Sequence, residues 1–348
     1  MTIPAKADGA GQTIALDPQL ETVPEPTKGE AKLEGRSPGQ LMWQRFKRDR
    51  TGVVCAFIVI FYFVIALAAP LLTMISGTDP YTLYGQDPTY ADRPVLDDFG
   101  LPLGWFGGIS GDHWFGVEPQ FGRDLFAMFV YGMRTSLFMA LGVTVLMMTT
   151  GVIIGLIGGY FGGRTDYWIG RVTDFFLSFP QQLFFIAFMP VVTSFFVDPR
   201  EETPTYFRAL AMLIVLWLLG WQGMSRLVRS TVLSLREREF VEAAKVSGAS
   251  PWRIVRKEIL PNVVTPILVQ FTYTLPSTIL TIAFLSFAGV GFVEPTPDWG
   301  RLFAAGSKYT EQDPAFIFFP GVALVIFVLA FNLLGDSVRD AFDPKSGR

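Results

Sequence analysis

The chain has 348 residues, of which 50% are apolar and 17% are charged, and its mean hydropathy is +0.38. An ordinary soluble domain has roughly a quarter of its residues charged, so this composition argues against one. One histidine and one cysteine, Cys55, exclude an internal disulfide and leave little from which to build a metal site. The net charge of −3 is uninformative by itself, and its distribution along the chain carries the information.

The N-terminal region divides into a polar tail and a basic entry segment. Residues 1–40 are rich in Pro, Gly, Ala, Glu and Lys, which predicts a disordered tail. In the stretch WQRFKRDRTG that follows, Trp43 and Phe46 alternate with basic residues, as is typical of a short amphipathic segment on the inner membrane surface. The first apolar run begins too far along the chain for a cleaved signal peptide, so we expect an uncleaved protein with several spans.

Six apolar runs follow, and most approach or exceed the roughly 20 residues that cross a bilayer. They are Val53–Leu72, Leu137–Ile157, Phe175–Val197, Tyr206–Met224, Val263–Val290 and Ala315–Leu334. We therefore predict an all-α membrane protein with six transmembrane helices, in which the prolines of the third and fifth runs kink the helix. The predicted divisions are an entry segment with the first helix (41–72), an external loop or cap (73–130), a core (131–335) that contains a charged loop (236–261), and a C-terminal segment (336–348).

The basic residues predict the orientation of these helices. Two segments are rich in Lys and Arg, one before the first span and one between the fourth and fifth spans. They hold Arg36, Arg45, Lys47, Arg48 and Arg50, and then Arg226, Arg229, Arg236, Arg238, Lys245, Arg253, Arg256 and Lys257. The 73–130 loop instead holds eight acidic residues and only Arg93 and Arg123. With six spans both basic segments fall on one side, so we expect both termini to be cytoplasmic and the acidic loop to be external.

Two patterns could be mistaken for chemistry. Gly155, Gly159 and Gly163 recur every four residues, but neither a preceding strand nor a following Lys-Ser/Thr makes them a phosphate cradle. Small residues at this spacing predict close packing of membrane helices. Arg171 and Asp174 lie near the start of the third span, where charge can be functional, although an i,i+3 pair is more often a local stabiliser.

The charged segment EFVEAAKVSGASPWRIVRKEILPN predicts a cytoplasmic helix–turn–helix between two spans. Glu239–Ser247 forms the first helix, and Gly248 closes it with a positive φ. Ser250 and Pro251 supply an N-cap and a first-turn proline for the second helix, which Pro261 ends just before the fifth span. The second helix is expected to place three apolar side chains on one stripe: Trp252, Val255 and Ile259.

The first helix of this segment carries a patch of small residues, Ala243 and Ala244, beside Glu242. Alanines let the surface of a partner come close, and the neighbouring charges can fix its register. Any basic cytoplasmic loop can also lie on anionic lipid, but the glycine turn and the alanine pair are more than lipid attraction requires.

The run Glu242-Ala243-Ala244, three residues, then Gly248, with Ile254 and Leu260-Pro261-Asn262 downstream, resembles the EAA loop of permease subunits of bacterial ABC importers. The resemblance implies the type I importer permease fold, in which this loop is a coupling helix that docks on a cytoplasmic ATPase. The residues to which it assigns this docking are Glu242, Ala243, Ala244, Lys245, Gly248, Ala249 and Ser250.

Further stretches resemble the C-type permease of the dipeptide, oligopeptide and nickel group. They are RFKRDRTGVV, LSFAGVGFVEPTPDWG, GDSVRDAFDP and an external motif with matches at His113, Gly116, Gly122, Arg123, Asp124, Tyr131, Gly132 and Ser136. The chain departs from that pattern at Glu258, where the group commonly has histidine, and at Val117, Glu118 and Pro119 in the external motif. The loop between the first two spans is also longer than the group suggests.

The resemblance implies a permease subunit of the bacterial inner membrane that forms half of a pathway for di- or oligopeptides. The implied partners are a second, related permease, two ATPase subunits, an external solute-binding protein or lipoprotein, the peptide and membrane lipid, with no nucleic acid. No cofactor is expected in this chain, and ATP and Mg are expected on the ATPases, since no Gly-x-x-x-x-Gly-Lys-Ser/Thr is present. Nickel chelates, glutathione or another small solute remain alternatives.

Two more distant alternatives are an ion-coupled transporter and an intramembrane enzyme. The first usually has carboxylates in the middle of its spans, and the central parts of these six runs have none. The second needs a nucleophile beside a base, but the one histidine, His113, is expected outside the bilayer.

Overall fold

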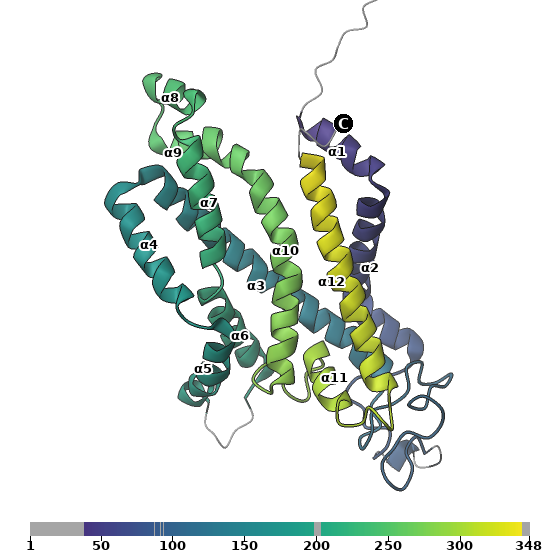
Figure 1. The fold of residues 1–348 in the computed structure, drawn as a ribbon. Coiled ribbons are helices and arrows are strands. Elements are labelled where there is room, and N and C mark those ends of the chain that lie inside the picture. The colour runs from purple at the N-terminus through teal and green to yellow at the C-terminus, as the bar shows by residue number, and fades with distance from the viewer. Residues whose placement is uncertain (1–37, 87, 91, 93, 198–202, 343–348) are drawn as a thin grey trace, which may run out of the picture. The chain divides into compact units, whose positions relative to one another are not determined.

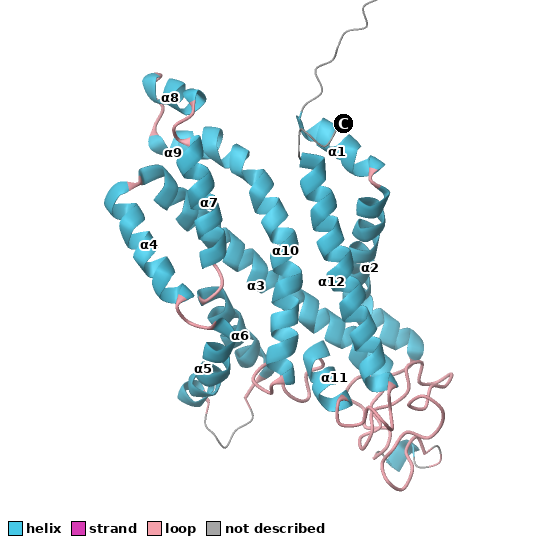
Figure 2. Ribbon diagram, viewed as in Figure 1, coloured by secondary structure: helices cyan, strands magenta, loops and turns pink. Residues whose placement is uncertain are grey.

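The structure, a computed structural model, describes residues 38–86, 88–90, 92, 94–197 and 203–342. Residues 1–41 and 42–348 form separate units. Of the first unit only the start of α1 (Pro38–Arg48) is described, so most of the predicted 1–40 tail lies outside the described residues, as do residues 343–348. The described part of the chain is helical and contains no strand beyond isolated bridges, Leu96 with Pro102 and Val117 with Asp124 (Figure 2).

Five helices are long and apolar enough to cross a membrane, and a bent pair makes a sixth candidate. They are α2 (Arg50–Ser76), α3 (Leu125–Phe161), α6 with α7 (Thr205–Leu218 and Gln222–Leu235), the helix that runs from Pro251 through α10 (Leu260–Phe287), and α12 (Ala315–Phe342) (Figure 1). The bent pair is α4 (Gly163–Leu177) and α5 (Gln181–Phe196), which meet at 79°. The expected all-α membrane architecture is confirmed.

Several predicted span boundaries are wrong. The third run is not one helix, because it includes the end of α4, the break at Ser178–Pro180 and α5. Pro180 has no N–H and disfavours helical geometry in the residue before it, so the chain turns there rather than bending gently. The second helix begins at Leu125 rather than Leu137, because Asp124 caps it there.

The starts of three helices share one local cause, an aspartate at the N-cap. The Asp49 carboxylate accepts a hydrogen bond from the Thr51 N–H (3.0 Å), and Asp124 and Asp298 cap α3 and the short α11 (Trp299–Gly306) in the same way. Each side chain thereby satisfies a backbone donor that has no partner inside the helix. The Asp124 cap ends the loop between α2 and α3, which includes the 3₁₀ turn Pro88–Tyr90, and the Asp298 cap lies in the segment between α10 and α12.

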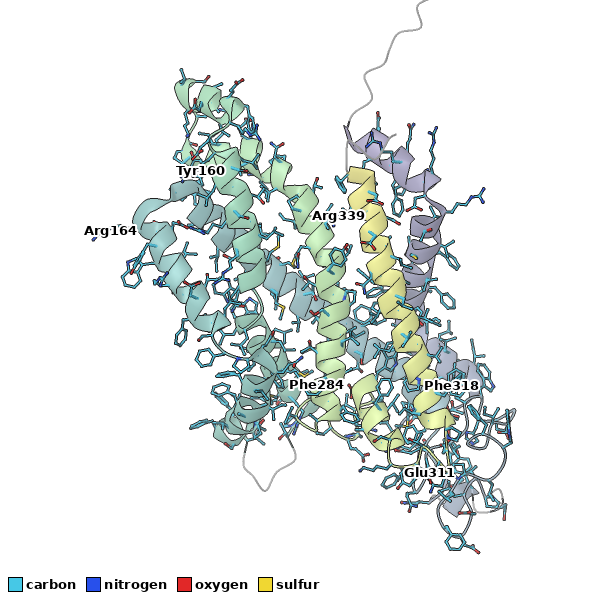
Figure 3. All side chains as sticks on the ribbon, viewed as in Figure 1. Tyr160, Arg164, Phe284, Glu311, Phe318 and Arg339 are labelled. Atoms are coloured by element: carbon cyan, nitrogen blue, oxygen red, sulfur yellow. The ribbon has the colours of Figure 1, made fainter. Side chains whose placement is uncertain are left out.

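The main apolar core forms around α3, which packs against α2, α6, α7 and α10, while α12 packs against α2 and α10. Among its largest fully buried side chains are Met128, Met133, Leu137, Phe185, Trp299, Phe316 and Phe327. Figure 3 shows labelled side chains at both ends of the helices, with Tyr160 and Arg339 toward one end and Glu311 and Phe318 toward the other.

The close packing predicted for the glycine repeat is confirmed at two of its three positions. A Cβ on Gly155 would lie 2.7 Å from the Ser225 carbonyl oxygen, and one on Gly159 would lie 2.7 Å from Cβ of Val232, so α3 and α7 meet where side chains are absent. Gly163 is different, because a Cβ there would meet open space and its φ of +55° starts α4. Gly151 extends the packed stripe instead.

Candidate functional site

The predicted docking segment forms α8 (Glu239–Val246), a turn, and α9 (Pro251–Ile254), and it stands at the end of the helices where α7 stops (Figure 1). Val241 fixes α8 in place, because its side chain is fully buried in an apolar cluster with Val232, Ile254 and Ile259. One buried valine on an eight-residue helix anchors the element and leaves its other faces open.

The turn between α8 and α9 is a Schellman motif. The Gly248 N–H donates to the Lys245 carbonyl oxygen (3.0 Å), and the Ala249 N–H donates to the Ala244 carbonyl oxygen (3.0 Å). Gly248 has a φ of +77°, which confirms the predicted left-handed residue. Ser250 takes the predicted N-cap position before Pro251, but its side chain makes no capping hydrogen bond.

The prediction that Pro261 ends the second helix is wrong. The chain stays helical from Pro251 to Phe287 through a π-helical turn, η2 (Val255–Ile259). In that turn the Leu260 N–H donates to the Val255 carbonyl oxygen, five residues back. Such a widened turn lets a proline without an N–H lie inside a helix without breaking it.

The widened turn also changes the predicted apolar stripe. Val255 and Ile259 are buried as expected, but Trp252 is 64% exposed and Ile254 is buried in its place. The prediction assumed regular helical spacing, which the π turn does not keep. Trp252 makes an edge contact with Phe161 at the end of α3, with ring centroids 6.1 Å apart.

Four exposed residues form one face of α8, here called the α8 outer face: Glu239, Glu242, Ala243 and Val246. Their spacing of three, four and seven residues places them together on a helix. Val246 is 90% exposed, which is unusual for a valine on an ordered helix. The α8 outer face thus combines two carboxylates with small and apolar side chains that could accept a close partner.

The structure separates the seven predicted docking residues into three groups. Glu242 and Ala243 lie on the α8 outer face, whereas Ala244 and Ala249 are half-buried against the apolar cluster beneath the turn. Lys245, Gly248 and Ser250 are exposed at the turn and its flank, and Nζ of Lys245 lies 3.5 Å from the Arg236 carbonyl oxygen. The sequence reading missed Glu239 and Val246, although their helical spacing from Glu242 and Ala243 could have identified them.

The external motif forms a second cluster, and here the polar groups are paired with one another. Nδ1 of His113 lies 2.7 Å from Oδ2 of Asp124, and both side chains are buried. The Asp124 carboxylate also accepts from the Ala127 N–H (2.7 Å) and the Thr78 hydroxyl (3.2 Å). The histidine therefore helps to hold the cap of α3.

Arg123 joins this loop to the loop that follows α10. Its guanidinium pairs through two nitrogens with the buried Glu118 carboxylate and donates to Oε1 of Glu294 (2.9 Å). Burial raises the pKa of the Glu118 carboxyl, and the Arg123 guanidinium opposes that rise. Val117, Glu118 and Pro119, which depart from the external motif, thus still supply a partner for its arginine.

The loop after α10 is also held at its end, where Asp298 caps α11 and Trp299 bonds to α3. The Asp298 carboxylate accepts from the N–H groups of Gly300 (3.1 Å) and Arg301 (3.2 Å), and the Trp299 N–H donates to Oγ of Ser136 on α3 (3.1 Å). Burial raises the pKa of Asp298 to about 6. These contacts hold the ends of the helices together at the end of the molecule opposite α8 (Figure 1). Among the described residues no group of three or more His, Cys, Asp or Glu side chains could hold a metal ion.

The described chain thus combines apolar helices long enough to span a membrane with a short charged helix at one end, as a multi-pass membrane protein would. Residues 151–348 match the family described as the binding-protein-dependent transport system inner membrane component, and residues 37–96 match the N-terminal TM domain of oligopeptide transport permease C. The chain belongs to the binding-protein-dependent transport system inner membrane component family.

Curated relatives match along most of the chain. The dipeptide transport system permease protein DppC of Alkalihalophilus pseudofirmus is 34% identical, over 96% of this chain and 99% of the relative. The oligopeptide transport system permease protein OppC of Bacillus subtilis is 33% identical, over 86% of this chain and 88% of the relative. The glutathione transport system permease protein GsiD of Pectobacterium atrosepticum is 32% identical, over 89% of this chain and 92% of the relative.

A solved structure shows the same fold. A chain of the methionine ABC transporter MetNI, in an inward-facing conformation, aligns with a TM-score of 0.50 at 21% identity and covers 63% of this chain and 98% of that chain. The protein is thus a multi-pass inner-membrane permease subunit of an ABC importer and is not itself an enzyme. An importer of this family has ATPase and binding-protein partners.

Proposed function

We propose that this permease moves short peptides, which an external solute-binding protein or lipoprotein delivers. It forms half of the pathway with a second, related permease, and two ATPase subunits that bind ATP and Mg drive it. Relatives named for dipeptide and oligopeptide transport match most of the chain and support the peptide assignment.

The observation that carries the coupling part of the proposal is the α8 outer face. Val241 and the Gly248 turn hold α8 in a fixed orientation, and the helix from Pro251 to Phe287 is continuous with the turn. A movement of α8 would therefore be transmitted to the spanning helix α10 without an intervening flexible loop. The seven docking residues of the loop, from Glu242 to Ser250, act in this proposal together with Glu239 and Val246. Both termini and α8 lie on the cytoplasmic side.

The loop between α2 and α3 is, in the same proposal, an external cap on which the binding protein lands. Two aromatic side chains of the loop stand out from it, Phe99 at 81% and Trp105 at 83% exposure. Exposed aromatic side chains are enriched where proteins bind one another. The buried ion pairs of Arg123 and His113 would keep this surface fixed on the ends of the spanning helices.

Glutathione is a second candidate substrate, since a relative named for glutathione transport matches almost as well. Glutathione is itself a tripeptide, so the same pathway chemistry would serve. A nickel chelate or another small solute would use the same architecture, and the binding protein would determine which solute is transported.

Purification of the tagged chain from native membranes tests the proposal. The expected complex contains one unlike permease, two ATPase subunits and a binding protein whose extracted ligand is a peptide. If the chain alone formed a homodimer that transported with ATPases, the proposed heterodimer would be wrong. Recovery of a metal chelate on the binding protein would overturn the peptide assignment and leave the subunit arrangement intact.

A further inference from the structure

A polar cavity of about 320 Å³ lies between α4 and α7. Five charged side chains line it: Asp166, Arg171 and Asp174 from α4, and Arg226 and Arg229 from α7. Both helices are parts of candidate membrane spans, and Arg226 and Arg229 belong to the basic segment that follows the fourth apolar run.

The charges in the cavity are paired at two levels. The first level is the ion pair of Arg229 with Asp166. Nη2 of Arg229 lies 2.6 Å from Oδ2 of Asp166, and the guanidinium contacts the carboxylate through two nitrogens. At the other level Asp174 is shared by Arg226 (2.5 Å) and Arg171 (3.2 Å). The Asp166 level is closed on itself, whereas at the Asp174 level two cations share one anion.

The Asp174 level is also the more open one. Its side chains are 45–60% exposed, against 20% for Asp166 and 38% for Arg229. Each guanidinium has five N–H donors, and the ion pairs with Asp174 engage one nitrogen of Arg171 and one of Arg226. Arg171 also lies over the Tyr167 ring, 5.5 Å from its centroid, in a cation–π contact.

We propose that this cavity binds the carboxylate of the transported solute, with Arg171 and Arg226 as its ligands and Asp174 as the carboxylate that occupies them when no solute is present. The inference rests on the proposed function, because an unmodified peptide carries a C-terminal carboxylate. With three arginines and two aspartates the cavity has one cation in excess, which a solute carboxylate neutralises. When the solute carboxylate replaces the Asp174 carboxylate, both arginines stay paired. The Asp174 carboxylate can then displace the solute again, which allows release.

The proposal predicts opposite effects from the two halves of one ion pair. Arg226→Gln removes a ligand and should lower the uptake of trialanine about tenfold, the value of one charge-assisted hydrogen bond. Asp174→Asn removes the competing carboxylate and should raise uptake severalfold. A purely structural ion pair would instead be weakened in the same way by either change.

The measurement is initial uptake by the complete transporter in phosphatidylcholine vesicles, at limiting loaded binding protein. Arg164→Gln is the matched control, because Arg164 is exposed on the same helix, is absent from the cavity lining and points away from the helices in Figure 3. Trialanine amide, which lacks the carboxylate, should be taken up equally by the wild type and by Arg226→Gln.

Equal losses in Arg226→Gln and Asp174→Asn would overturn the proposal. So would changes that appear only when phosphatidylglycerol is added to the vesicles, because the ligand would then be a lipid phosphate. Neither outcome contradicts the proposed function. That function is tested separately, by the composition of the purified complex and by the uptake of trialanine through the Arg164→Gln control variant.

Discussion

The α8 outer face and the external ion-pair cluster are both rich in charge, and they use it in opposite ways. In the external cluster Arg123 and Glu118 are each 4% exposed and paired with each other. On α8, by contrast, Glu239 and Glu242 are exposed, and within the described chain neither side chain has an ion pair.

This difference separates charge that holds the fold from charge that is left for a partner. Loss of a buried, paired group leaves its partner buried without compensation and costs stability. Loss of an exposed, unpaired group costs the isolated subunit little, so any effect it has must come from the assembly. The following changes, in order of decreasing effect on stability, test that separation.

Arg123→Ala should have the largest effect on stability, a loss of about 3–5 kcal/mol, because it leaves the Glu118 carboxylate buried and unpaired. Thermal unfolding of the detergent-solubilised chain measures it. The control replaces both partners, Arg123→Met with Glu118→Met, and should recover most of the loss. If the single variant unfolds at the wild-type temperature, the ion pair does not hold the external loops together.

Asp313→Asn should increase stability, by about 1–3 kcal/mol at pH 7.5. The residue is fully buried before α12, and burial raises its pKa to about 6, while the backbone N–H groups of Phe316 and Ala315 oppose that rise. A folded-state pKa above the ordinary value means that the protonated acid is favoured and that stability is lost as the pH rises through about 6. The gain in the variant should therefore shrink between pH 7.5 and pH 5.

Thermal unfolding at both pH values measures this gain. Glu311→Gln, which neutralises an exposed acid in the same loop, is the control and should change nothing at either pH. A gain for Asp313→Asn that did not depend on pH would show that the buried carboxylate does not titrate near pH 6.

Gly248→Val should cost about 1 kcal/mol or more, because a branched side chain disfavours the φ of +77°. A Cβ at this position meets open space, so the cost is conformational and does not come from a clash. The effect should appear as weaker stimulation of ATP hydrolysis by loaded binding protein, since α8 would be misaimed. Gly248→Asn, which tolerates a left-handed backbone, should retain stimulation, and equal losses in both variants would exclude this cause.

Glu242→Lys should have the smallest effect on stability, within the error of the melting temperature, and a large effect on assembly. The reversed charge would face a partner surface that accepts a carboxylate, where like charges cost several kcal/mol. Co-purification of the ATPases should fall sharply. Glu237→Lys, an exposed change next to α8 but outside its outer face, should leave co-purification unchanged.

The sequence was sufficient for the features that depend on local chemistry. Gly248 at the end of α8 predicted a left-handed turn, and the apolar runs predicted the spans. The errors arose where backbone hydrogen bonding could adapt. Pro180 interrupts the third predicted span, whereas Pro261 lies in a continuous helix after a π turn. Nothing in the local sequence distinguishes these two outcomes.

Contacts between distant segments were also beyond the sequence. Arg171 and Asp174 predicted a local pair, but the structure adds Arg226, 52 residues further along the chain. The pairing of Arg123 with Glu294 depends in the same way on how two external loops fold against each other. Only the packing of helices brings such groups together.

The central claim, that the α8 outer face docks on an ATPase, is tested most directly by a photo-crosslinking amino acid at Val246 in native membranes. Val246 is 90% exposed, so the probe disturbs no packing inside the chain. The account predicts a crosslink from this position to an ATPase subunit, and none to an ATPase from the same probe at Trp105 in the external loop. A probe at Val246 that crosslinks only to lipid, or one at Trp105 that captures the ATPase, would contradict it.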